Sequence, residues 1–461
     1  MEPHEYASHD AVGLRQLLVA GAVSGADVEA AARRAIADVN PALNALAGPL
    51  LADALDFSAD GPLGGVPFLL KDSGPFARGV GFSAGSRAIH GAVASDDHPL
   101  MRAFRAAGLA ALGRTTAPEL GLNFATESLR YGVTRNPWLP TRGVGGSSGG
   151  AAALVAAGAV PIAHASDGAG SIRVPASACG LVGLKPGRGI VPGSVGSGFA
   201  GSADYSLGYD FVVTRTVRDS AAVLDSVSWP PTASSRLLAD PGRVRVALAT
   251  EAWSGAPVDD EVAAAAADVA RTLEWIGHRV SEASPAIEGE AVVEAQLLAV
   301  IGAGRTLLRA PVEPNWDALE RVSRAAVREA TNATTDEIRA MVAAGGGIRR
   351  SVDSFFERFD VLVTPTMAVL PPAHGTLDYD GFAGDCRDWL REIFTAGPFT
   401  AAFNVSGHPA ISVPTGFSRG GLPIGVQLVG AHGRDALLLQ LAAQLEQAMP
   451  WSGRVPSVYA D

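Results

Sequence analysis

The sequence predicts an α/β protein in which helices and strands pack in layers. Short apolar runs with strand character alternate along the chain with segments whose apolar residues follow helical spacing. Hydrophobic residues make up 48% of the 461 residues and charged residues 18%, which is typical of a globular protein with a large core. The length accommodates one large α/β domain or two ordinary ones.

The first fifty residues are expected to be helical, because Ser24 and Asp27 form a capping box and apolar residues then recur on one helix face. A Gly/Ser loop at 143–150 opens an alanine-rich helix, and a second loop at 166–171 follows a strand at 160–164. The other elements expected in this half are a strand at 63–70, a helix at 99–108, a strand at 109–113, a polar loop region at 115–136 and a Gly/Ser-rich surface stretch at 187–208.

The second half begins with a βαβ-type unit. A strand at 244–249 leads into a helix that starts with three acidic residues, 259–261, and ends at Gly277. The elements expected after it are mostly helical structure at 286–358, a strand at 361–363, a hairpin of strands at 410–413 and 424–429, and a helix at 435–447.

The charge and cysteine content exclude several classes of function. A net charge of −11 argues against binding to nucleic acid or to an anionic membrane. Two cysteines, Cys179 and Cys386, indicate neither a disulfide framework nor a metal cluster, and the nine histidines show no metal-ligand spacing. The N-terminal residues lack the pattern of a secretory signal, so we expect a cytoplasmic protein with a small-molecule substrate and no metal.

Only two of the 36 basic residues are lysines, Lys71 and Lys185. Arginine serves surface charge and anion binding equally well, but it keeps its proton, whereas a buried lysine can lose it and act as a base. Lys71 follows the apolar run 66–70, at the end of an expected buried strand, where burial depresses the pKa of a lysine. We therefore expect a functional role for Lys71.

The two Gly/Ser loops allow several kinds of chemistry. The loop at 143–150 lacks the lysine of a phosphate-binding loop and the third glycine of a dinucleotide-binding loop. It formally matches the G-x-S-x-G nucleophile elbow of an esterase, with Ser148 as nucleophile and Asp360 and His408 as candidate partners, although no strand is expected directly before it.

A Ser-Ser-Lys relay explains both loops and the retained lysine together. In this relay Ser171 attacks a carbonyl, Ser147 bridges, and neutral Lys71 takes the proton. The small residues before Ser171 allow a sharp turn whose N–H groups converge on the developing oxyanion; such donors are worth about 3 kcal/mol each. The donors would be the backbone N–H groups of Gly168, Ala169 and Gly170.

Several separated motifs, in the right order, resemble those of the amidase signature family over nearly the whole chain. They are found at 61–72, 145–150, 166–175, 179–186, 403–410 and 421–427. The resemblance implies a three-layer α/β/α fold with a large mixed β-sheet covered by helices, in one domain over 1–461. Its core signature region spans about 61–190, and a variable substrate-pocket region spans about 190–400.

Carried over residue by residue, the resemblance gives each motif residue a role. It makes Lys71 the base, Ser147 the bridging serine held by a cis peptide, and Ser171 the nucleophile. The oxyanion hole comes from the backbone of 168–171, and Lys185 becomes a structural residue. The loops are supported by Ser148, Asp167 and Arg173.

The implied reaction is hydrolysis of the C–N bond of an amide or carbamate, or of an ester, through an acyl-enzyme and without a cofactor. The chain would be a monomer or homodimer, with pocket walls from 123–131, 193–205 and parts of 290–400. Ala169 stands where the family usually has glycine, and Ser166 where threonine is frequent. Within the family, the sequence is similar to bacterial hydrolases that act on nylon cyclic oligomers, aryl acylamides and urethanes.

Three alternatives stay open. One is the amidase subunit of a tRNA-dependent amidotransferase, a reading weakened by Val174, which stands where that subunit typically has glutamine. The others are the Ser148 esterase and a binding module that keeps the fold without catalysis.

Overall fold

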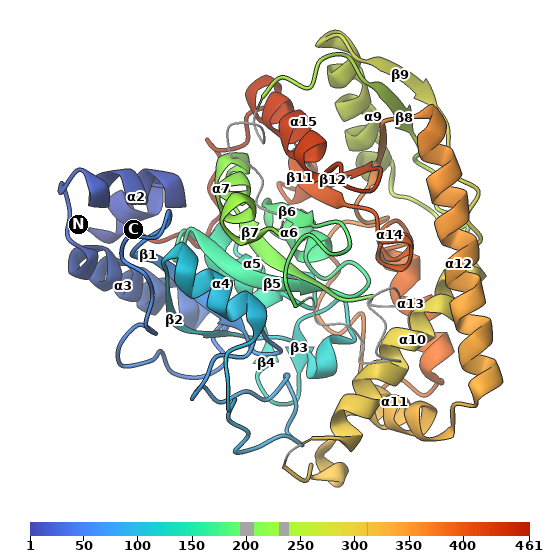
Figure 1. Ribbon diagram of the computed structural model, residues 1–461, viewed down its shortest axis with the longest axis horizontal. Helices are drawn as coiled ribbons and strands as arrows, with labels where there is room; N and C mark the ends of the chain where they lie inside the picture. The colour runs from blue at the N-terminus through green and yellow to red at the C-terminus, as the bar shows by residue number, and fades with distance from the viewer. Residues whose placement is uncertain (194–206, 230–238, 311) are drawn as a thin grey trace.

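The computed structural model describes residues 1–193, 207–229, 239–310 and 312–461 and is built on one ten-stranded mixed sheet (Figure 1). The strand order is β2-β1-β5-β7-β6-β11-β12-β10-β8-β9. Their bounds are β1 (Val66–Lys71), β2 (Leu109–Thr115), β5 (Ile162–Asp167), β6 (Val182–Lys185), β7 (Tyr209–Thr214), β8 (Arg245–Leu248), β9 (Arg279–Glu282), β10 (Val361–Pro365), β11 (Ala410–Phe417) and β12 (Pro423–Gly430).

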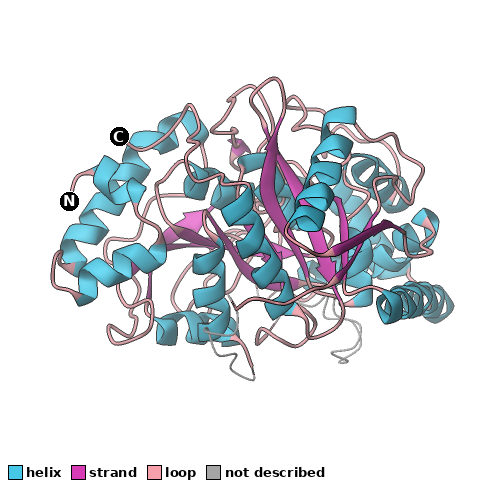
Figure 2. Ribbon diagram, turned by 90° about the horizontal axis from the view of Figure 1, so that it is seen from above, coloured by secondary structure: helices cyan, strands magenta, loops and turns pink. Residues whose placement is uncertain are grey.

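Helices cover both faces of this sheet, which confirms the predicted α/β/α architecture (Figure 2). The helices in the described residues are α1 (Pro3–Ser8), α2 (Ala11–Val19), α3 (Gly25–Leu43), α4 (Pro99–Ala107), α5 (Gly149–Ala156), α6 (Arg173–Cys179), α7 (Val217–Val227), α9 (Asp260–Trp275), α10 (Gly289–Leu308), α11 (Arg321–Asn332), α12 (Thr335–Arg358), α13 (Cys386–Ala396), α14 (Ala401–Ser406) and α15 (Asp435–Ala448). A two-stranded ribbon of β3 (Glu127–Ser128) and β4 (Gly132–Val133) lies apart from the main sheet.

The predicted elements form for the reasons that the sequence supplies. The capping box at Ser24 is present, and α3 buries the apolar face that begins at Val28. The predicted βαβ unit is β8-α9-β9, with parallel strands, and the predicted hairpin is the antiparallel pair β11-β12. The strand expected at 160–164 instead runs from Ile162 to Asp167, because Ser166 and Asp167 pair with β7.

The sheet brings Lys71 and the second Gly/Ser loop to the same side. Strands β1 and β5 are parallel neighbours, paired through Phe68 and Ile162. Their carboxyl ends, at Lys71 and Asp167, therefore lie on the same side of the sheet. The expected surface stretch at 187–208 falls largely outside the described residues.

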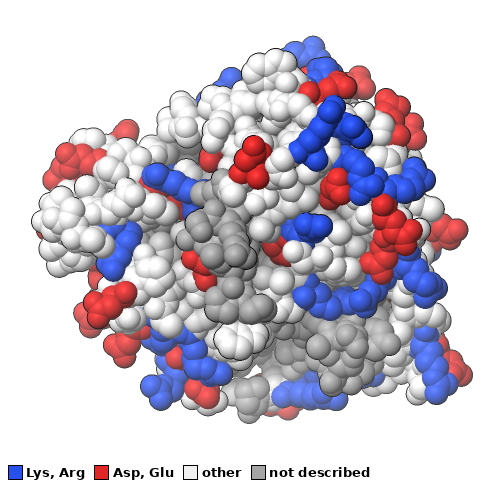
Figure 3. Space-filling view, turned by 45° about the horizontal axis from the view of Figure 1, so that its top comes forward, with Lys and Arg blue, Asp and Glu red and all other residues white. Residues whose placement is uncertain are grey.

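Both lysines are buried, so the exposed basic side chains are arginines. Basic and acidic side chains are interspersed over the face seen in Figure 3. Helix α10 is the one described helix that is long and apolar enough to cross a membrane, but it packs inside the protein against α11, α12 and α13. That packing is typical of a core helix of a globular protein.

Candidate active site

Lys71 ends β1 and is 2% exposed. Its Nζ lies 2.7 Å from Oγ of Ser147 and 2.9 Å from Oγ of Ser166. Burial lowers the pKa of Lys71 to about 7, against the opposing effect of the Asp210 and Asp167 carboxylates. A substantial neutral fraction at neutral pH therefore has a lone pair available to a serine hydroxyl.

Ser147 is held in a loop that only glycines allow. The Gly146–Ser147 peptide bond is cis, and Gly145 has a φ of +75°. A Cβ on Gly146 would lie 2.7 Å from the carbonyl oxygen of Asn123, so the close approach of the two backbones excludes any side chain there. This packing places the Ser147 hydroxyl against Lys71.

The loop between β5 and α6 carries Ser171, which is 4% exposed. The carbonyl of Gly168 accepts a hydrogen bond from Gln296 and that of Ala169 accepts one from Thr400. Because peptide units are planar and trans, the N–H groups of Ala169 and Gly170 point the opposite way. Within the described residues, the Ser171 hydroxyl makes no hydrogen bond, so no hydrogen bond links it to Ser147 in this structure.

A buried ion pair anchors this loop. Burial alone would raise the pKa of Asp167, but Arg173 and Asn404 hold it below its usual value. Nε and Nη2 of Arg173 each donate to Asp167 at 2.9 Å, and both side chains are fully buried. The remaining hydrogen bonds of Arg173 go to the carbonyl of Thr400 and to the side chains of Gln427 and Asn404.

The second lysine lies elsewhere. Nζ of Lys185 donates to the Pro186 carbonyl at 2.9 Å and sits 3.6 Å from the centroid of the Tyr209 ring. Burial lowers the pKa of Lys185 well below its usual value. Its contacts are with the framework, as the family resemblance implies for this position.

Ser148, Asp360 and His408 do not form the triad of a nucleophile elbow. Oγ of Ser148 hydrogen-bonds the backbone of Ser166, which ties the two loops together. Asp360 pairs with Arg245, and His408 contacts Ser406 and Asp353. The three candidate members of that triad therefore have other partners.

Two residues that act on Lys71 are not identified by the sequence analysis. One is Ser166: the sequence shows only that it stands where threonine is frequent, whereas the structure places its hydroxyl 2.9 Å from Nζ of Lys71. Asp210, on β7, bonds the fully buried His164 and raises the pKa of Lys71 by its charge. No local motif marks Asp210, because its position depends on the pairing of β7 with β5. Of the expected pocket segment 193–205, residues 194–205 lie outside the described part of the chain.

Comparisons with known proteins identify the family of this chain. A family model described as Amidase matches residues 28–439. The chain belongs to the amidase signature family. It is therefore an amidase, a hydrolase acting on amides.

The amidase is similar to several characterised or solved members of the family. It is 38% identical to the 6-aminohexanoate-cyclic-dimer hydrolase of Paenarthrobacter ureafaciens, over 97% of this chain and 96% of that protein. The solved structure of a 6-aminohexanoate cyclic dimer hydrolase with substrate superposes with a TM-score of 0.90 at 34% identity, covering 98% of this chain and 99% of the other. A bacterial aryl acylamidase structure gives a TM-score of 0.82 at 25% identity, covering 96% and 97%.

Proposed function

We propose that this amidase cleaves its substrate through an acyl-enzyme on Ser171, with the proton relayed through Ser147 to neutral Lys71. The observation that carries the proposal is the 2.7 Å contact between Nζ of buried Lys71 and Oγ of Ser147. Ser171 attacks the carbonyl carbon, and its proton moves to Ser147 as the Ser147 proton moves to Lys71. The relay then protonates the departing amine, and water releases the acyl group in a second cycle.

The oxyanion would be stabilised by backbone N–H groups of the 168–171 loop. Gln296 and Thr400 hold the carbonyls of this loop, which fixes the orientation of its peptide units before the substrate arrives. Donors fixed in advance stabilise the charge that develops on the carbonyl oxygen without reorganisation cost during the reaction.

The acyl part of the substrate is proposed to be apolar. A small cavity of about 50 Å³ adjoins the nucleophile loop at Gly168 and Ala169. Its wall is made largely of apolar side chains from α10, α11 and α13, and these include Ala299, Val300, Val322, Leu390 and Ile393. Such a wall favours an aliphatic or aromatic acyl group over a polar one.

Covalent labelling tests the nucleophile. A fluorophosphonate should add one adduct per chain, on the peptide that contains Ser171, and Ser171→Ala should abolish it. Ser281→Ala serves as the matched control, because Ser281 is an exposed residue of β9 outside both loops and should leave labelling intact. An adduct on Ser148, or labelling that survives in Ser171→Ala, would reject the acyl-enzyme on Ser171 and favour the esterase mechanism.

A substrate panel tests the class of bond. By similarity to the 6-aminohexanoate-cyclic-dimer hydrolase, we expect turnover of cyclic and linear aliphatic amides. Anilides and esters with the same acyl group complete the panel, because the same acyl-enzyme can form from each of them. Carbamates are assayed as a separate class, because loss of their amine leaves an alkoxycarbonyl group on the serine instead. Hydrolysis of polar, short-chain primary amides in preference to all apolar ones would contradict the proposed pocket.

A further inference from the structure

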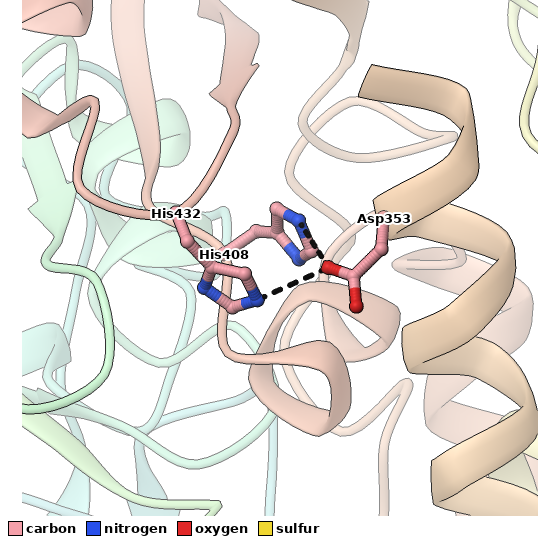
Figure 4. Close-up of side chains that lie close together, drawn as sticks. All are labelled: Asp353, His408 and His432. Atoms are coloured by element: carbon pink, nitrogen blue, oxygen red, sulfur yellow. Dashed lines mark ion pairs between the residues drawn. The ribbon is translucent and has the colours of Figure 1, made fainter. Parts of the chain in front are cut away.

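A second cluster of titratable side chains lies outside the catalytic loops (Figure 4). Asp353 is on α12, His408 is in the turn between α14 and β11, and His432 follows β12. Nε2 of His408 and Nε2 of His432 each lie 3.3 Å from the same oxygen, Oδ1 of Asp353. All three donor atoms lie within 4.8 Å of one another.

These separations match the spacing of ligands around one metal ion. Zinc binds histidine nitrogen and carboxylate oxygen at about 2.0–2.2 Å, so two ligands of a tetrahedral zinc ion lie about 3.3–3.5 Å apart. The observed 3.3 Å between each imidazole nitrogen and the carboxylate oxygen falls within that spacing. It is also longer than the usual N–H···O hydrogen bond of about 2.7–3.2 Å. Binding would require the partly exposed His432 ring to turn away from its stacked position on His408, because two imidazoles on one tetrahedral ion have ring centroids about 5 Å apart.

The His408 ring is fixed before any ion arrives. It is 1% exposed and stacks against the Phe356 ring, with centroids 5.2 Å apart, and against the His432 ring at 3.9 Å. Its Nδ1 lies 3.0 Å from Oγ of Ser406. A partner on one ring nitrogen orients the other nitrogen toward a metal, as in the outer shells of known metal sites.

The exposure of the cluster suits a metal ion. His432 and Asp353 are 37% and 44% exposed, which gives an ion access from solvent and room for water ligands.

Nearby positive charge disfavours hard cations. Arg349 Nε lies 3.8 Å from Oδ2 of Asp353, the oxygen that does not face the histidines. A single carboxylate that already pairs with Arg349 gives little attraction for Mg²⁺ or Ca²⁺, whereas two imidazoles suit zinc, nickel, copper or cobalt.

We propose that Asp353, His408 and His432 form a binding site for a divalent transition-metal ion of the zinc type, completed by water. The ion would tie α12 to the ends of α14 and β12. Since the ligands come from three elements that the unfolded chain does not hold together, the bound ion would stabilise the fold. His408 also follows α14, whose Asn404 bonds Asp167 beside the nucleophile loop.

Zinc titration of the tag-free, chelator-treated full chain tests the site. We expect one Zn²⁺ bound per chain by calorimetry, a Tm that rises with Zn²⁺ concentration, and no rise with Mg²⁺. His432→Ala and Asp353→Asn should each weaken binding by at least about tenfold, since even an outer-shell partner is worth about 10–100-fold. His90→Ala, which removes an exposed histidine elsewhere, is the matched control and should bind like the wild type.

Both variants change partly exposed side chains, so they are expected to fold, and their metal-free Tm verifies this. Absence of stoichiometric Zn²⁺ binding to the wild type would overturn the proposal. So would binding that survives unchanged in both folded variants, because the ion would then lie elsewhere. Neither outcome affects the Ser171 labelling experiment, so the metal site and the acyl-enzyme are tested separately.

Discussion

Nζ of Lys71 lies 2.7 Å from Oγ of Ser147, in a place from which water is nearly excluded. In water a lysine side chain is almost fully protonated at neutral pH and cannot act as a base. Here burial removes much of the stabilisation that water gives to the charged amine. The neighbouring hydroxyls of Ser147 and Ser166 are uncharged and do not replace it. This arrangement is the one that the proposed mechanism requires of a base and its first proton donor.

The pH dependence of the reaction follows from the protonation of Lys71. Its pKa is lowered to about 7, and only the neutral amine accepts a proton. We therefore expect kcat/KM to rise with pH and to level off above an apparent pKa near 7. The measurement is a pH–rate profile on an amide that does not ionise over this range. A flat profile from about pH 5.5 to pH 9 would contradict a lysine base.

Lys71→Arg keeps the positive charge but not the base. Arginine stays protonated at every accessible pH, so we expect kcat to fall by roughly 10²–10⁴-fold, the usual contribution of a general base. The fall should persist at about pH 9, where the wild type is fully active. Steady-state kinetics across pH check this, and the Tm of the variant shows whether it has folded. Turnover close to that of the wild type would reject the relay.

The burial that lowers the pKa of Lys71 should also reduce the free energy of unfolding. The pKa of Lys71 is about 7 in the folded protein against 10.5 for an unperturbed lysine, so between these values the unfolded chain binds more protons. Stability must then rise with pH in this window. The loss in free energy of unfolding is therefore largest below about pH 7, and it disappears above pH 10.5, the pKa of an unperturbed lysine.

Lys71→Met removes this dependence. From about pH 7.5 to pH 9.5, the free energy of unfolding of the wild type should rise relative to that of Lys71→Met by about 1 kcal/mol per pH unit. Urea unfolding at several pH values measures the difference, and using one variant as reference cancels the titration of other groups. A difference that does not change with pH would mean that Lys71 keeps its proton in the folded state.

The sequence was sufficient to predict most elements and the residues of the two loops. Alternating apolar segments predicted the α/β layers, and the capping box at Ser24 predicted the start of α3, because both are local signals. The scarcity of lysine pointed to Lys71, and the glycines around Ser147 predicted a loop, in which the structure shows close backbone contacts. These predictions rest on local signals, which can be recognised within one segment of the chain.

What escaped prediction depends on contacts between distant segments. Asp210 acts on Lys71 only because β7 pairs with β5, and no spacing along the chain shows this. The cluster of Asp353, His408 and His432 joins three elements through residues far apart in sequence, so a search for metal-ligand spacing had no pattern to find. The strand end that the sequence predicts for β5 is too early for the same reason, because the pairing of Asp167 with Tyr209 extends the strand.

The ion pair of Asp167 and Arg173 should be among the most sensitive positions in the chain. Both side chains are fully buried, so Arg173→Met leaves a carboxylate without its charged partner in a medium that solvates it poorly. We expect a loss of about 3–5 kcal/mol in the free energy of unfolding, measured by urea denaturation. Arg339→Met is the matched control, because its pair with Asp336 is exposed and should contribute little.

The double variant Asp167→Asn with Arg173→Met separates the charge from its packing. If the loss in Arg173→Met comes from an uncompensated buried charge, neutralising Asp167 as well should recover part of the stability. Activity should not recover, because Asp167 Oδ2 also accepts from the backbone N–H of Ile172, directly after the nucleophile. Full additivity of the two single losses would show that the residues act independently. It would contradict a coupled pair that holds the Ser171 loop in place.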